Sequence, residues 1–270
     1  MMKIALVQSS LVWGDVDKNL THFDRLLKSG EKADVILLPE MFVSGAMMMR
    51  KEWEVSVREK EEVAARYEEV KERMSEWAMY RDALVIGSTV CREMGNFYNR
   101  LVVAFPDGRF LHYDKRHCFR IGGEHEHFSV GTEQLVFEFR GVRIAAFICY
   151  DLRFPVWCRN TREYDLAVFV ANWPESRREV WQTLLKARAI ENQAYVAGVN
   201  CVGTDRDGLK YSGDSALIDP YGRVIGEAAP FTESVLTLEL DKERVVGFRK
   251  KFPVLDDRDD FKITGNTVSC

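Results

Sequence analysis

Three short apolar runs limit the folds that are open to this chain. They occupy residues 33–39, 142–148 and 165–171, and polar residues hardly alternate with apolar ones inside them. Short runs of this kind are typical of strands buried in a sheet. Further strands are expected over residues 3–8 and 194–202, and helices over residues 17–33, 53–81 and 175–192. This alternation predicts an α/β fold, with sheet inside and helices outside.

Length and composition favour one domain. The chain has 270 residues, of which 46% are hydrophobic, and this is enough to build one sizeable core. No linker rich in Pro, Gly or Ser interrupts it, and no internal repeat is found. We therefore expect residues 1–270 to form a single domain.

Charge and cysteine content restrict the partners and the compartment. A net charge of −4 gives no electrostatic footprint for nucleic acid, and the apolar runs are too short to span a bilayer. The N-terminus lacks the apolar stretch and the cleavage site of a signal peptide, so it indicates a first strand. Six cysteines at scattered spacings, without a CxxC pair, suit reduced thiols. These features predict a cytoplasmic protein that binds neither nucleic acid nor membranes.

Cys149 is the candidate nucleophile. It directly follows the run 142–148 and precedes residues 150–155, which have the pattern of a turn and a helix start. A thiol at a helix N-terminus lies where backbone N–H groups favour an anion, so it can become a thiolate. A lone cysteine is more often a small buried hydrophobic residue, and Cys149 by itself leaves both interpretations open.

Two charged residues hold comparable positions. Glu40 ends the first apolar run, and Lys115 follows a strand-like segment, residues 99–111, that a turn at 106–108 interrupts. Functional crevices of open α/β sheets lie beyond the carboxyl ends of strands, so these side chains can converge with Cys149. Each charge alone is typical of a solvated surface. Together, a carboxylate, an ammonium group and a thiol are what acyl transfer through a thioester requires.

The order and surroundings of these residues resemble the nitrilase, or carbon–nitrogen hydrolase, superfamily. The resemblance rests on Leu38-Pro-Glu40, Asp114-Lys-Arg-His117 and Cys149-Tyr-Asp-Leu-Arg-Phe-Pro155, and it extends over nearly the whole chain. It implies a four-layer α-β-β-α sandwich. It also implies homodimers or higher homo-oligomers that join through helices next to the active site.

A narrower likeness is to the bacterial omega-amidases. The segments that carry it are residues 115–120, 124–128, 154–160, 171–174 and 187–195. It implies an amidohydrolase that converts small keto-acid monoamides, 2-oxoglutaramate and 2-oxosuccinamate, to the dicarboxylate and ammonia. The small amide is the expected partner, and no metal or organic cofactor is required.

The charges and the resemblance together predict the catalytic roles. Glu40 is expected to accept the thiol proton, and Cys149 to form a thioester with the acyl group. Lys115 and the backbone N–H of Tyr150 are expected to stabilise the oxyanion. The resemblance implies that a fourth residue, Glu124, positions the lysine and the hydrolytic water.

Some assignments stay open at this level. Glu126 is a rival of Glu124 for the fourth catalytic position. Trp173 and Phe119 are expected to wall the pocket. Arg120 is the first choice for binding the substrate carboxylate, because a guanidinium group binds carboxylates through two parallel hydrogen bonds. A second arginine, Arg153, is the other candidate for binding the substrate carboxylate, but a structural ion pair behind the nucleophile is favoured for it.

Three alternatives compete with the omega-amidase interpretation. A related enzyme of the superfamily acting on nitriles, neutral amides or N-carbamoyl compounds is the strongest. A metallohydrolase would need ligands such as those of residues 124–127 with His112 and His117, but the sequence has no HExxH motif. A non-catalytic protein of the same fold would not need Glu40, Lys115 and Cys149 together.

Overall fold

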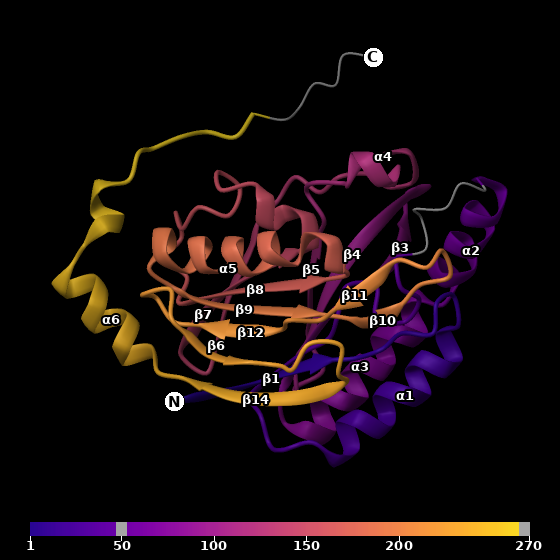
Figure 1. The fold of residues 1–270 in the computed structure, drawn as a ribbon, viewed down its shortest axis with the longest axis horizontal. Coiled ribbons are helices and arrows are strands. Elements are labelled where there is room, and N and C mark those ends of the chain that lie inside the picture. The colour runs from indigo at the N-terminus through magenta and orange to yellow at the C-terminus, as the bar shows by residue number, and fades with distance from the viewer. Residues whose placement is uncertain (47–52, 265–270) are drawn as a thin grey trace.

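Two six-stranded β-sheets lie face to face, and helices cover the outer side of each (Figure 1). The computed structural model describes residues 1–46 and 53–264 of the chain. The layers follow the order helix, sheet, sheet, helix, so the expected α/β fold and the four-layer α-β-β-α sandwich are confirmed. Within the described ranges, no helix is long and apolar enough to cross a membrane.

The first sheet has the strand order β14-β1-β2-β3-β4-β5. Its strands are β1 (Met2–Gln8), β2 (Val35–Leu37), β3 (Leu84–Glu93), β4 (Asn96–Ala104), β5 (Phe110–Asp114) and β14 (Ser234–Leu240). Strands β1, β2 and β3 run parallel, and the remaining neighbours pair antiparallel. The helices on this side of the molecule are α1 (Val16–Ser29), α2 (Trp53–Ala65) and α3 (Tyr67–Arg81).

The second sheet has the order β13-β12-β9-β8-β7-β6. Its strands are β6 (Leu135–Phe139), β7 (Val142–Ile148), β8 (Leu166–Ala171), β9 (Tyr195–Asn200), β12 (Ala216–Ile218) and β13 (Val224–Glu227). Helix α5 (Arg178–Asn192) covers its outer face (Figure 1). A separate two-stranded sheet consists of β10 (Val202–Thr204) and β11 (Lys210–Ser212). Two further helices are α4 (Glu124–His127) and α6 (Lys242–Lys251).

Strand β1 explains why the apolar runs lack alternation. Ile4 and Leu6 belong to the hydrophobic cluster between the sheets. Ala5 and Val7 belong to the second cluster, which also contains side chains of α1 and α3. Because successive side chains of a strand point to opposite faces, a strand covered on both faces must be apolar throughout. Burial of each large aliphatic side chain contributes about 2 kcal/mol to the sandwich.

One predicted helix is in fact two. The prediction of a single helix over residues 53–81 is wrong, because α2 ends at Ala65 and α3 begins at Tyr67. At the junction, the Arg66 N–H donates to the Val63 carbonyl oxygen at 3.0 Å, which is a tighter turn than that of an α-helix. At this break the Arg66 guanidinium pairs with Asp17 of α1 and with Glu69.

Three other boundaries differ from the predictions. Helix α1 ends at Ser29, before residue 33. Residues Glu175–Arg177 form a 3-10 turn, and α5 begins only at Arg178. The expected strand over 194–202 divides into β9 and β10, which lie in different sheets. The ends of elements depend on tertiary neighbours, and sequence patterns locate them poorly.

The strand directions place the candidate site. Strand β5 runs in the same direction as β2 and β3, because β4 is antiparallel to both β3 and β5. The carboxyl ends of β2 and β5 therefore lie at one edge of the first sheet. Strands β7 and β8 run parallel in the second sheet. The candidate site is therefore built by residues that follow β2 and β5 of the first sheet and β7 and β8 of the second. It does not lie at the rim of a single open sheet.

Candidate active site

Cys149 stands at a strained elbow. It follows β7 directly and begins a five-residue 3-10 helix, Cys149–Arg153. Its φ of 42° lies in the left-handed region, which costs a non-glycine residue about 1–2 kcal/mol. Strain of this kind persists only where the surroundings hold it, often at functional sites. The expected turn and helix start is a single short 3-10 helix that ends at Arg153, too short to supply a substantial helix dipole to the thiol.

Asp151 holds the elbow in place. Its carboxylate accepts hydrogen bonds from the Ile148 N–H at 3.1 Å and from the Tyr113 hydroxyl at 2.7 Å. It also accepts from the backbone N–H of His117 at 3.0 Å and contacts His117 Nδ1 at 2.8 Å. Because Tyr113 and His117 flank Lys115 in sequence, Asp151 joins the elbow of the second sheet to the lysine segment of the first. The sequence analysis did not identify this residue.

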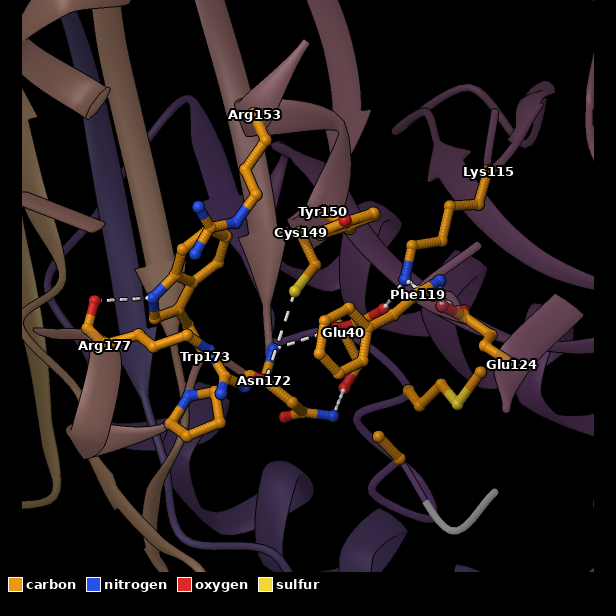
Figure 2. A pocket seen from close by; sticks show the side chains of 13 residues that line it. Glu40, Lys115, Phe119, Glu124, Cys149, Tyr150, Arg153, Asn172, Trp173 and Arg177 are labelled. Atoms are coloured by element: carbon orange, nitrogen blue, oxygen red, sulfur yellow. Dashed lines mark hydrogen bonds and ion pairs between the residues drawn. The ribbon is translucent and has the colours of Figure 1, made fainter. Parts of the chain in front are cut away.

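Glu40, Lys115 and Glu124 form a buried charged cluster (Figure 2). Lys115 Nζ lies 2.8 Å from Glu40 Oε1 and 2.9 Å from both carboxylate oxygens of Glu124. Burial opposes the charge of Lys115, but the carboxylates of Glu124 and Glu40 outweigh it and raise the pKa of the lysine well above its usual value. Lys115 is therefore an ammonium group at neutral pH.

The two carboxylates are held by neutral donors as well. The backbone N–H of Asn172 donates to Glu40 Oε2 at 2.9 Å, and its side-chain amide donates to the Glu40 carbonyl oxygen at 2.9 Å. The Phe119 N–H donates to Glu124 Oε2 at 2.6 Å. Asn99 Nδ2 donates to Glu40 Oε1 at 2.8 Å and to Glu124 Oε1 at 3.3 Å. Neither asparagine was identified from the sequence, although Asn172 directly follows the apolar run 165–171. Asn99 lies inside a strand and offers no such signal.

The Cys149 thiol faces this cluster (Figure 2). Its Sγ lies 4.0 Å from the Asn172 carbonyl oxygen. Burial, and then the negative charge of Glu40, raise the pKa of Cys149 well above its usual value, while Lys115 acts in the opposite direction. The thiol of the resting protein is therefore protonated. Nucleophilic attack needs a base that removes this proton, and Glu40 is the adjacent carboxylate.

A pocket opens beside the thiol (Figure 2). It is lined by Glu40, Met41, Ala46, Lys115, Phe119, Glu124, Cys149, Tyr150, Arg153, Asn172, Trp173, Pro174 and Arg177. The structure thus brings together seven of the residues singled out from the sequence, together with Arg153. Glu126 is exposed and does not line the pocket, whereas Glu124 is buried beside Lys115.

The arginines are placed differently from the expectation. Arg120 begins a short 3-10 turn at the surface, where its side chain is exposed outside the pocket. Arg153 lines the pocket instead of forming an ion pair behind the elbow, and its guanidinium carbon lies 4.9 Å from the ring centre of Trp173. Arg177 lies 5.3 Å from the ring centre of Phe119. Neither Arg153 nor Arg177 forms an ion pair with any described residue.

The histidines do not converge on one point. His117 contacts Asp151, His125 lies beside Glu126, and His112 belongs to β5. No group of three or more His, Cys, Asp or Glu side chains among residues 1–46 and 53–264 is arranged to hold a metal ion. The described side chains therefore offer no ready set of metal ligands.

Comparisons with known proteins agree with this geometry. The carbon–nitrogen hydrolase family model matches residues 3–250. The omega-amidase YafV of Yersinia enterocolitica is 46% identical over 260 residues, covering 96% of this chain and 98% of that protein. The 2-oxoglutaramate amidase of Bacillus subtilis is 32% identical over 258 residues, covering 94% and 96% respectively.

A solved structure shows the same fold. It is that of a CN-hydrolase superfamily protein from Xanthomonas campestris, with an arsenic adduct in its active site. It superposes with a TM-score of 0.90 at 38% identity, and the match covers 97% of this chain and 99% of that one. Because family model, relatives and fold agree over nearly the full length, the chain belongs to the carbon–nitrogen hydrolase family of the nitrilase superfamily.

Proposed function

We propose that this protein is an omega-amidase, which hydrolyses the distal amide of small keto-acid monoamides such as 2-oxoglutaramate and 2-oxosuccinamate. The names of two similar proteins, an omega-amidase and a 2-oxoglutaramate amidase, support this substrate class. The observation that carries the proposal is the pocket itself, where a buried thiol, carboxylate and ammonium group face a cavity that also holds two arginines.

Acylation begins with proton transfer from Cys149 to Glu40. The sulfur attacks the amide carbon, and the oxyanion receives hydrogen bonds from Lys115 Nζ and the Tyr150 N–H. Loss of one such donor typically costs about 3 kcal/mol of transition-state stabilisation. Glu40 then gives its proton to the amide nitrogen, the carbon–nitrogen bond breaks, and ammonia leaves. The acyl group remains on Cys149 as a thioester.

Deacylation uses the same groups in reverse order. Glu40 removes a proton from water while the water oxygen attacks the thioester carbon. The carbon–sulfur bond breaks, the thiolate regains the proton from Glu40, and the dicarboxylic acid is released. Glu124, which accepts hydrogen bonds from Lys115 through both oxygens, holds the ammonium group in position for both steps.

The substrate carboxylate needs a cation, since an unpaired buried charge would oppose binding. We assign this role to Arg153 and Arg177 in place of Arg120, because both line the pocket and neither has an ion-pair partner among the described residues. The rings of Trp173 and Phe119 support the two guanidinium groups from the sides of the pocket.

Ammonia release from a matched panel of substrates tests the proposal. The panel comprises 2-oxoglutaramate, a neutral amide of equal length, the corresponding nitrile and an N-carbamoyl amino acid. We expect kcat/KM for 2-oxoglutaramate to exceed that for the neutral amide at least about a hundredfold, as expected for loss of a charged hydrogen-bonded pair. Equal hydrolysis of neutral amides, nitriles or N-carbamoyl compounds would instead assign another activity of the superfamily.

Arginine variants locate the carboxylate site. Arg153→Met and Arg177→Met should lower kcat/KM for 2-oxoglutaramate while changing the neutral amide little. Arg120→Met is the matched comparison, because its side chain lies outside the pocket. If only Arg120→Met loses the preference, the assignment to the pocket arginines is wrong. Activity that chelators abolish would contradict the thioester mechanism.

We also propose that the protein is cytoplasmic and forms homodimers or larger homo-oligomers. All five cysteines within the described ranges are free and buried, which suits a reducing compartment. Large apolar side chains are exposed at Ile190 of α5, Val246 of α6 and Phe252 after α6. Light scattering of the purified protein measures the oligomeric state, and a monomer at micromolar concentration would contradict this assignment.

A further inference from the structure

The charged cluster carries more negative than positive charge. Glu40 and Glu124 both pair with Lys115, and both side chains are buried in the wall of the pocket. Two carboxylates that share a site normally force one of them to take up a proton. A protonated Glu40 cannot accept the proton of Cys149, so the donors around the two carboxylates matter to the proposed mechanism. The backbone N–H groups of Asn172 and Phe119 each serve one carboxylate, Glu40 and Glu124 respectively.

Asn99 is the neutral side chain that contacts both carboxylates. Its Nδ2 donates to Glu40 Oε1 at 2.8 Å and to Glu124 Oε1 at 3.3 Å. These are the same two oxygen atoms to which Lys115 Nζ donates. Hydrogen bonds to the ionised form of a carboxyl group favour that form. Asn99 therefore acts on Glu40 and Glu124 in the same direction as the ammonium group.

The backbone of Asn99 also fixes the lysine. Its carbonyl oxygen accepts the backbone N–H of Lys115 at 3.0 Å, where β5 leaves β4. One residue of β4 thus sets the start of the Lys115 segment and the distance between the two carboxylates. Asn99 itself is 1% exposed and is not among the residues that line the pocket.

The side-chain oxygen of Asn99 supports the orientation in which Nδ2 points to the two carboxylates. Asn99 Oδ1 is buried and has no hydrogen-bond partner among the described residues. Turning the amide over would place this oxygen against two carboxylates, which repel it. A buried acceptor without a partner costs stability. The protein tolerates that cost where the opposite end of the amide contacts two anions.

We propose that Asn99 is a positioning residue that holds Glu40 and Glu124 side by side against Lys115, so that Glu40 remains a base for Cys149. This inference rests on the proposed thioester chemistry but not on the choice of amide substrate. The titratable groups whose charges interact with these carboxylates are Lys115, Cys149, Cys118 and Cys201, and two charged residues, Arg153 and Arg177, line the same pocket.

The pH profile of kcat/KM tests the proposal, because its acid limb reports the ionisation of the base in the free enzyme. Asn99→Leu keeps the number and branching of the side-chain heavy atoms but removes the donor. We expect the acid limb to move to higher pH by about one unit. We also expect kcat to fall roughly ten- to hundredfold, since the carboxylates lose their relative position. Any amide that the wild-type protein hydrolyses serves as substrate.

Asn99→Asp is the second variant and has the same shape as the native residue. Near neutral pH it adds a third carboxylate, so it should be less active than Asn99→Leu. At lower pH its own carboxyl group takes up a proton and becomes a donor, so its activity relative to Asn99→Leu should rise as the pH falls. Asn96→Leu, an exposed change at the start of the same strand, is the control and should keep the wild-type profile.

Two results would overturn the proposal. One is a wild-type acid limb in a folded Asn99 variant, with folding checked by urea unfolding. The other is an equal loss of activity at every pH in both variants, which would give Asn99 a packing role only. If the wild-type protein lacks a preference for keto-acid amides, the substrate assignment fails while the Asn99 test still stands on any amide that is hydrolysed.

Discussion

At the scale of single residues, the candidate nucleophile owes its chemistry to its neighbours. Burial raises the pKa of the Cys149 thiol, so the thiol is inert until a base removes its proton. Glu40 adds to that shift, and Lys115 works against it. A buried base and a buried cation next to one thiol allow proton transfer inside the protein without release of charge to solvent.

Replacement of the thiol gives the first prediction. Cys149→Ala should lower kcat by roughly 10⁴-fold or more, because the thioester cannot form. Cys91→Ala is the matched control, since this thiol is also buried and burial likewise raises its pKa, to about 11, but it lies on β3 outside the pocket. Ammonia release and mass spectrometry of acid-quenched enzyme check the result. Turnover by Cys149→Ala at the rate of Cys91→Ala would end the thioester hypothesis.

At the scale of elements, the contact between β9 and α5 positions one wall of the pocket. A Cβ atom on Gly198 would lie 2.7 Å from both Leu185 Cδ1 and Trp181 Cζ2 of α5, which is too close for any side chain. Trp181 in turn packs against Trp173, with 5.5 Å between ring centres. Because Gly198 has no side chain, α5 can approach β9 closely. This close contact sets the position of Trp173 in the pocket.

Two glycine substitutions test this packing. Gly198→Ala should lower the free energy of unfolding by about 1–3 kcal/mol, because overpacking forces α5 away from the sheet. Gly247→Ala in α6 is the control, since nothing lies within 4 Å of the added methyl group. That change should raise stability by roughly 0.5–1 kcal/mol, as alanine does in a helix. Urea unfolding measures both, and an equally stable Gly198→Ala protein would contradict the close contact.

At the scale of the whole molecule, buried thiols link stability to pH. Burial raises the pKa of Cys118 to about 12 and holds the pKa values of Cys149, Cys158 and Cys201 well above the usual value. In the unfolded chain these thiols ionise near pH ~8.5. Above that pH the folded state binds more protons than the unfolded state, so the free energy of unfolding must fall as the pH rises.

The corresponding prediction concerns the range between pH 8.5 and 9.5. Below pH ~8.5 the thiols make their full contribution to the free energy of unfolding. Above that pH, each thiol lowers the free energy of unfolding by up to about 1.4 kcal/mol per pH unit. Lys115, whose pKa is raised in the folded state, adds a loss in the same direction only above pH ~10.4. Urea unfolding at several pH values should show a shallower slope for Cys158→Ala than for the wild type. A flat wild-type profile would contradict the prediction.

The fold class could be predicted from local patterns. Apolar runs without alternation, such as residues 165–171, occur where a strand is covered on both faces, and this single physical requirement already implies helices outside the sheet. The helix boundaries were harder to predict from the sequence. At the break, Arg66 pairs with Asp17 of another helix, and no glycine or proline marks this position in the sequence.

The sequence by itself determined which chemistry was available, since Glu40, Lys115 and Cys149 each end a strand-like run and side chains at strand ends lie at the edge of a sheet. Tertiary structure alone decided which neutral and charged groups surround them. Asn99 and Asn172 reach Glu40 across 59 and 132 positions of the chain. Arg153 and Arg177 line the pocket while Arg120 does not, because side-chain direction depends on how the two sheets face each other. Contacts so distant in sequence leave no local pattern for periodicity or spacing to detect.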